Sequence, residues 1–132
     1  MGPHGTRHGG PAIALVCDAP AIGRRLAQDL ECLGGSLRSY PAGPATRDAL
    51  CADPPDLVIA VVMARDPSAL CLCQSVGQTE PFAATRLVVL QDTCREIDHR
   101  RARALGADAS LPLPCDPAQL REAALRLLAE HA

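Results

Sequence analysis

The chain has 132 residues, of which 48% are apolar and 21% are charged; this is the composition of one globular domain and excludes a disordered chain. Thirteen basic residues against 15 acidic residues give a net charge of −2, which argues against an electrostatic binder of nucleic acids or membranes. Every basic residue is arginine, so mechanisms that need a lysine are excluded, including Schiff-base chemistry and P-loop phosphate binding.

Short apolar runs at five places predict β-strands. In chain order these strands are expected at 12–17, 36–40, 57–63, 86–90 and 109–113. Apolar residues with helical spacing, together with helix-start and helix-stop signals, predict helices at 21–33, 46–51, 67–76, 95–105 and 116–129. Residues 1–11 are interpreted as a flexible N-terminal tail, so the folded domain is expected to be 12–132.

Strands that alternate with helices require right-handed crossovers and a parallel sheet covered on both faces. The predicted fold is therefore a flavodoxin-like (βα)5 doubly wound α/β sheet with strand order 2-1-3-4-5. In such a sheet, ligands bind beyond the carboxyl ends of the strands, near the first and third strands. Fold alone does not define function, so the residues at that edge must be read separately.

Four segments together resemble the receiver domains of two-component response regulators, and the resemblance covers residues 12–129. They are Val16–Pro20, Pro55–Ile59, Ala104–Ala109 and Leu111–Leu120. The family implies two adjacent acids that hold Mg²⁺, an Asp that accepts the phosphoryl group and a Thr or Ser that hydrogen-bonds it. It also implies an aromatic switch residue and a Lys that neutralises the phosphate. Such residues stabilise the charge of the transferring group.

Aligned with the family, the residues of this degenerate phosphorylation pocket are Cys17 and Asp18 (acidic pair), Val61 (acceptor), Gln91 (Thr or Ser), Ser110 (aromatic) and Leu113 (Lys). Leu113 precedes Pro114, where the Lys-Pro bond of the family is usually cis. Only Asp18 keeps the family's chemistry. The sequence therefore predicts a pseudo-receiver that is neither phosphorylated nor an enzyme, and that carries no cofactor.

A pseudo-receiver is regulated by binding rather than by phosphotransfer. The expected partner is another protein, namely a sensor, an output domain or a regulator. The segment 33–38 loosely resembles the receivers of antitermination regulators, whose nucleic-acid binding lies in a separate output domain. Two alternatives stay open: a small-molecule, thiol or metal sensor that uses the vacated pocket, and a receiver phosphorylated unusually on Asp18 or Asp66.

The predicted fourth helix carries the densest run of charges, 95–103, interpreted as a solvated face with pairs such as Glu96–Arg100 or as a docking surface. In receivers the fourth helix and the fifth helix form the output and dimer face. The candidate partner or homodimer surface is therefore Arg95, His99, Arg100, Arg103, Leu120 and Leu125, with His99 expected on the surface.

Seven cysteines, an odd number scattered through apolar segments, are typical of reduced thiols and predict a cytoplasmic location. No apolar run reaches the roughly 18 residues of a membrane span, so no membrane contact is expected. Cys17, Cys94 and Cys115 are expected near the same edge of the sheet, and Cys17 and Asp18 are weak metal-ligand candidates. Asp18 is otherwise interpreted as a cap for the following helix.

Overall fold

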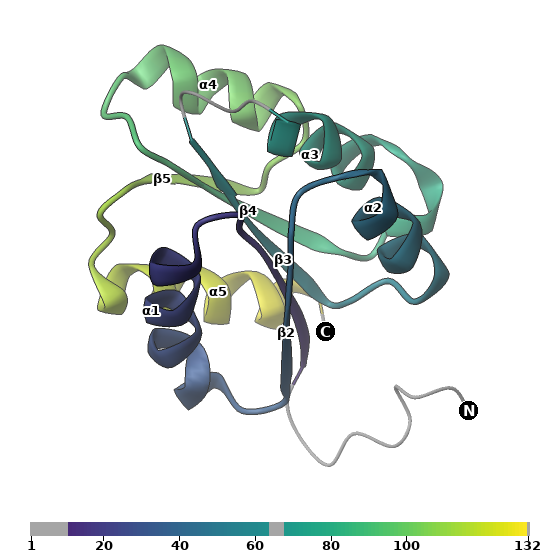
Figure 1. The fold of residues 1–132 in the computed structure, drawn as a ribbon, viewed down its shortest axis with the longest axis horizontal. Coiled ribbons are helices and arrows are strands. Elements are labelled where there is room, and N and C mark those ends of the chain that lie inside the picture. Colours follow the sequence, from purple (N-terminus) through teal and green to yellow (C-terminus); the bar gives the residue numbers. More distant parts are fainter. Residues whose placement is uncertain (1–10, 64–67, 132) are drawn as a thin grey trace.

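The computed structural model describes residues 11–63 and 68–131. One parallel sheet has the strand order β2-β1-β3-β4-β5, as predicted (Figure 1). Its strands are β1 (Ala12–Val16), β2 (Ser36–Tyr40), β3 (Leu57–Val62), β4 (Arg86–Gln91) and β5 (Ala109–Pro112). The helices are α1 (Pro20–Leu30), α2 (Pro44–Ala52), α3 (Ser68–Gln78), α4 (Glu96–Ala104) and α5 (Pro117–His131). Two short 3₁₀ turns, η2 (Glu31–Leu33) and η3 (Glu80–Phe82), complete the described elements.

The helices cover both faces of the sheet, which is why β3 is apolar at every position. Val58, Ala60 and Val62 pack in one core with α2, α3 and α4, whereas Leu57 and Ile59 pack in a second core with α1 and α5. All six side chains of β3 are buried. The nearly continuous apolar run that predicted this strand therefore follows from burial on two faces.

The amino-terminal edge of the sheet is held by side-chain bonds to the backbone. Asp56 Oδ2 accepts a hydrogen bond of 2.8 Å from Ala12 N, and Asp108 Oδ2 accepts one of 2.8 Å from Leu87 N. The hydroxyl of Thr85 donates to Pro55 O at 2.7 Å. These bonds satisfy backbone groups at the places where strands begin.

The C-terminal end of α3 lies against the loop between α4 and β5 at the same edge. A Cβ added at Gly77 would lie 2.6 Å from Leu105 O and 2.7 Å from Gly106 Cα. Gly106 has a φ of 120°, a value that side chains disfavour. Glycine is therefore required at both positions of this contact. Gly77 is required because a side chain has no space there, and Gly106 is required both for space and for its backbone conformation.

The expected tail, residues 1–11, lies outside the described residues except for Pro11. The last helix extends to His131, two residues beyond the prediction, and α1 ends at Leu30 before the turn η2. Within the described ranges no helix is both long enough and apolar enough to cross a membrane.

Candidate functional site

The residue that the sequence predicts at the acceptor position of receivers, Val61, is a core residue in the structure. Val61 belongs to β3, is only 4% exposed and packs in the core shared with α1 and α5. Its backbone neighbour across the sheet is Leu90 of β4. An alkyl side chain in this place has no oxygen that attacks phosphorus, so Val61 takes no part in phosphoryl transfer.

Asp18 directs its carboxylate to the backbone of a neighbouring loop. Its Oδ1 accepts a 2.9 Å hydrogen bond from Ala42 N, which lies just before α2. The residue at the N-cap of α1 is Ala19, and no side-chain bond caps that helix. The interpretation of Asp18 as a cap for α1 is therefore wrong, because the carboxylate joins β1 to the β2–α2 loop instead.

The expected edge cysteines do not form a common site in the described structure. Cys17 Sγ donates to Ala19 O at 3.3 Å and lines a hollow with Gly23 and Ser39. Cys115 lines a different pocket, and Cys94 is exposed. No group of three His, Cys, Asp or Glu side chains that could hold a metal ion occurs within residues 11–63 and 68–131.

Burial raises the pKa of the thiols of Cys17 and Cys115, and in each case the following aspartate adds to the shift. Asp29 raises the pKa of Cys115 further. Reactive thiols have a lowered pKa, because the thiolate is the nucleophile. Both groups are therefore less reactive than an ordinary thiol, which argues against a redox role.

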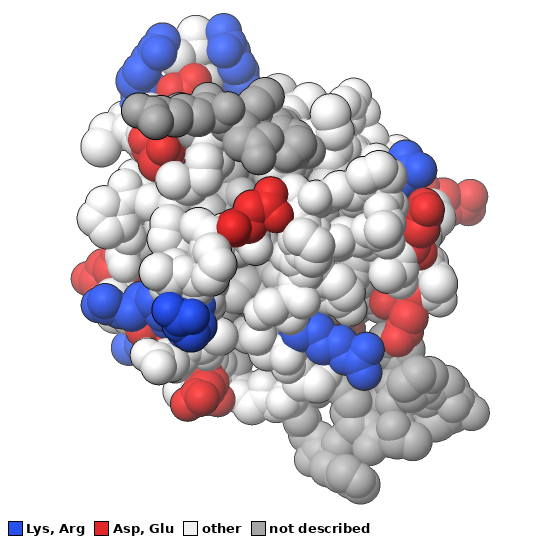
Figure 2. All heavy atoms as spheres, in the orientation of Figure 1, with Lys and Arg blue, Asp and Glu red and all other residues white. Residues whose placement is uncertain are grey.

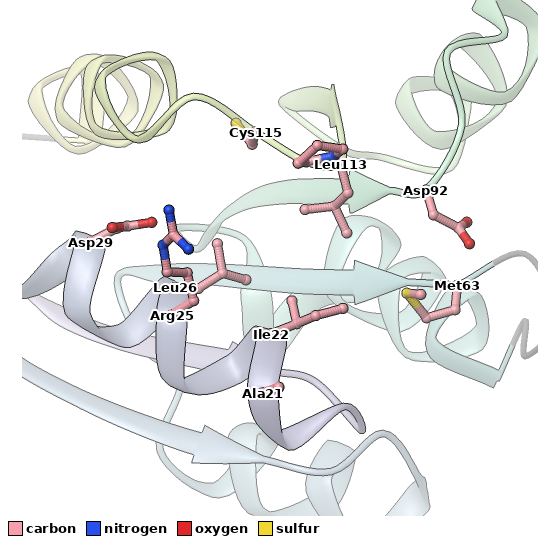
Figure 3. A pocket seen from close by; sticks show the side chains of 10 residues that line it. Ala21, Ile22, Arg25, Leu26, Asp29, Met63, Asp92, Leu113 and Cys115 are labelled. Carbon is pink, nitrogen blue, oxygen red and sulfur yellow. The ribbon is translucent and has the colours of Figure 1, made fainter.

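A pocket of about 470 Å³ opens between α1 and the segment that follows β5. Figure 3 shows Ile22 and Leu26 pointing from α1 toward Leu113, with Met63 at one end. Leu113 is the residue predicted at the family's Lys position, and its peptide bond to Pro114 is cis. Of the six predicted pocket residues, Leu113 alone lines this pocket, whose polar members are Arg25, Asp29 and Asp92.

Gln91 and Ser110 lie on neighbouring strands and meet a histidine from α4. Gln91 Nε2 donates to Ser110 Oγ at 3.1 Å and to Asp98 O at 3.1 Å. His99 Nδ1 lies 2.5 Å from Ser110 Oγ, and His99 Nε2 lies 2.9 Å from Thr93 O. We call this set of contacts the Gln91–Ser110–His99 relay.

The expectation that His99 lies on the surface is wrong, since it is only 6% exposed. The phase of the helix is the reason: His99 and Ala102 are three residues apart and are the two buried residues of α4. The spacing of His99 and Ala102 is present in the sequence, but charged residues surround it in this segment, so the sequence does not indicate which side of the helix is buried. The hydrogen-bond partners of His99 come from other elements and left no sequence signal.

Leu120 is also wrongly placed in the predicted partner surface. It is completely buried and packs with Ala124 and Leu127 against the sheet. Leu125, five residues further along α5, is 55% exposed, as predicted. A helix turns by 100° per residue, so two leucines five positions apart lie on different sides.

The other members of the predicted surface are exposed on or beside α4. Arg95, Arg100 and Arg103 are exposed, and Ile97, which the sequence reading missed, is 45% exposed. Arg103 forms a 2.8 Å ion pair with Glu96, where Glu96–Arg100 had been expected. Figure 2 shows positive side chains on both sides of the end of the molecule that α4 forms, with negative side chains between them, and further positive side chains elsewhere on this face.

Comparisons with known proteins agree with this fold. No family model matches the chain. The chain is 32% identical, over 111 residues, to the transcriptional regulatory protein GltR of Pseudomonas aeruginosa; the match covers 84% of this chain and 46% of that protein. The chain thus spans about half the length of this curated relative.

Two solved structures are similar over most of the chain. A putative response regulator from Chloroflexus aurantiacus has a TM-score of 0.83 at 20% identity, with 92% of this chain and 99% of that chain covered. The DrrB receiver domain, solved in a BeF3-activated form, has a TM-score of 0.73 at 23% identity, with 92% and 99% covered. The chain therefore has the fold of a response-regulator receiver domain.

Proposed function

We propose that this chain is a receiver domain that has lost phosphotransfer and works as a non-enzymatic interaction module in bacterial signal transduction or in the control of transcription or antitermination. The similarity to a transcriptional regulatory protein supports the setting. The observation that carries the proposal is the buried valine, Val61, at the acceptor position. Its regulation would come from binding, in the cytoplasm, and without a resident cofactor.

The remaining pocket residues support the same conclusion. Phosphoryl transfer needs a nucleophile, a metal ion and a cation that neutralises the developing charge. Leu113 supplies no cation, and the thiol of Cys17 has a raised pKa. Mg²⁺ prefers six oxygen ligands, and Asp18 is the one carboxylate left of the family's acidic pair. Asp66, the other alternative acceptor, lies outside the described residues.

Titration with Mg²⁺ and beryllofluoride, followed by amide NMR, tests this proposal. We expect no shift of the amides of Asp18, Gln91 and Ser110, because no carboxylate stands at the acceptor position to coordinate the beryllium. The DrrB receiver domain, whose structure was solved in a BeF3-activated form, is the positive control. Concerted shifts at these three amides, lost in Asp18→Asn, would show that the pocket still accepts a phosphoryl mimic.

The expected partner is a protein, and the face between α4 and α5 is the surface we propose for it or for a second copy of this chain. Ile97 on α4 and Leu125 on α5 are large exposed apolar residues, and such residues often mark contacts. Any contact with nucleic acid would belong to an output domain. Analytical ultracentrifugation of the wild type and of the double variant Ile97→Glu/Leu125→Glu tests a homodimer through this face. Equal molecular masses of the two proteins in solution would exclude that homodimer.

The pocket beside Leu113 supports a second candidate function, the binding of a small apolar ligand. Its volume is about 470 Å³, within the usual range for ligand sites, and apolar side chains form most of its wall. The dye anilinonaphthalene sulfonate is a suitable probe, because it combines an aromatic body with one negative charge near Arg25. We expect fluorescence enhancement that Leu113→Lys abolishes and the surface control Leu125→Lys retains; equal enhancement in all three proteins would exclude this site.

A further inference from the structure

Buried polar side chains are concentrated at the junction of β4, β5 and α4. In the described residues the buried polar or charged side chains are Thr46, Gln91 and His99, and two of these three belong to the Gln91–Ser110–His99 relay. A buried polar group is costly unless it is hydrogen-bonded. No buried side-chain nitrogen or oxygen in this part of the chain lacks a partner. The relay is therefore a satisfied network whose geometry is tightly constrained.

The partners determine the direction of every hydrogen bond in the relay. Thr93 O accepts only, so His99 Nε2 must carry the hydrogen. Nδ1 of a neutral imidazole is then an acceptor, and the Ser110 hydroxyl donates to it. Ser110 Oγ in turn accepts from Gln91, whose second amide hydrogen goes to Asp98 O. One neutral tautomer of His99 thus satisfies all the groups together.

A second set of bonds holds the loop between β4 and α4. The Thr93 hydroxyl donates to Asp98 Oδ2 at 3.0 Å and accepts from Arg95 N at 3.0 Å. Arg95, at the N-cap of α4, makes no side-chain capping bond itself. The start of α4 is therefore held by Thr93 from the loop and by Gln91 and Ser110 from the sheet.

We infer that the Gln91–Ser110–His99 relay locks α4 onto the sheet, so that the exposed surface of α4 has one conformation without any phosphoryl group. In this arrangement the residues at the Thr and aromatic positions of the family bind a histidine rather than respond to a phosphate. Ile97 and Arg100 are then presented to a partner permanently. This consequence for regulation rests on the proposed function, whereas the lock itself does not.

Hydrogen exchange of the backbone amides tests the lock with Ser110→Ala. Removing the hydroxyl leaves His99 Nδ1 and one Gln91 amide hydrogen without partners, and we expect exchange in 93–104 to become about tenfold faster. Ser110→Thr keeps the hydroxyl and should restore protection. Thr85→Ala is the matched control, because it removes a comparable hydroxyl bond at the opposite edge of the sheet.

The lock would be overturned if Ser110→Ala left exchange in 93–104 unchanged. It would also be overturned if exchange accelerated equally throughout the chain, as expected for simple loss of global stability. Side-chain ¹⁵N NMR provides an independent readout: wild-type His99 should show the Nε2–H tautomer, and the Nδ1–H tautomer or a mixture of both would contradict the relay. Neither measurement depends on beryllofluoride, so failure of the lock and failure of the proposed function are distinguishable.

Discussion

Aspartate side chains hold the backbone at both ends of the sheet. At the amino-terminal edge, Asp56 and Asp108 accept hydrogen bonds from strand amides. At the carboxyl-terminal edge, Asp18 also binds a backbone amide, and Val61, which the sequence predicts at the acceptor position of receivers, is buried. The comparison indicates that this fold is maintained by its core and by its amino-terminal edge.

Gly77→Ala should have the largest effect on stability. Its Cβ would collide with backbone atoms of Leu105 and Gly106, which have no freedom to rotate away. We expect the free energy of unfolding to fall by about 2–3 kcal/mol, as for overpacking elsewhere. Urea denaturation followed by circular dichroism measures this change.

Gly23→Ala is the matched helical control. Its Cβ would lie 3.8 Å from Cys17 Cβ, an ordinary contact, and alanine favours a helix by up to about 1 kcal/mol over glycine. Stabilisation by Gly23→Ala with destabilisation by Gly77→Ala would sharpen the comparison. Equal effects would show that the contact between α3 and the α4–β5 loop is looser than the structure indicates.

Asp108→Ala should rank second. The substitution removes a charged acceptor from the amide of buried Leu87, and we expect a loss of about 2 kcal/mol in the free energy of unfolding. Asp48→Ala is the control, because its pair with Arg47 is exposed and 3.5 Å long; a change within about 0.5 kcal/mol is expected. If Asp108→Ala and Asp48→Ala have the same midpoint of thermal unfolding, the amino-terminal edge does not stabilise the fold as described.

Asp18→Ala should cost less than Asp108→Ala, although both remove a bond to a backbone amide. The hydrogen bond of Asp18 to Ala42 N is exposed, so water can replace it, whereas the bond of Asp108 to the amide of buried Leu87 is partly buried. We expect a loss of roughly 0.5–1 kcal/mol in urea denaturation. A loss of 2 kcal/mol or more would mean that the carboxyl-terminal edge also supports the fold, and the contrast between the two edges would fail.

The smallest expected effect concerns thiol chemistry and leaves stability unchanged. Burial raises the pKa of Cys17 and of Cys115, and raises the pKa of Cys73 to about 12. A raised pKa lowers the fraction of thiolate at a given pH, so the alkylation rates of Cys17 and Cys115 should be low at pH 8. Both rates should continue to increase with pH in the range where an ordinary thiol is already ionised. Buried Cys73 should react only after unfolding.

Mass spectrometry of iodoacetamide-treated protein across a pH series measures these rates site by site. The exposed thiols of Cys32, Cys71 and Cys94 serve as internal references. Reaction of Cys17 or Cys115 faster than these references at neutral pH would contradict the assignment of both as unreactive, and would revive the thiol-sensor alternative for that edge of the sheet.

Local patterns were sufficient to predict the strands, the helices and the order of the sheet. Apolar runs such as Leu57–Val62 indicate strands buried on two faces, and short helical crossovers leave few topologies to choose from. The position of Val61 rests on the resemblance to receivers, aligned by the spacing of the strand ends, and its assignment to the acceptor position stays a prediction. The absence of lysine from the sequence required no structure at all.

Tertiary structure alone decided how the polar side chains are used. Asp18 binds Ala42, which is 24 residues away, and His99 binds Ser110, which is 11 residues away. A local pattern states which residues share a helix face but not what packs against that face. The surface assignments of His99 and Leu120 failed for this reason, and the lock on α4 became visible only when β4, β5 and α4 were brought together.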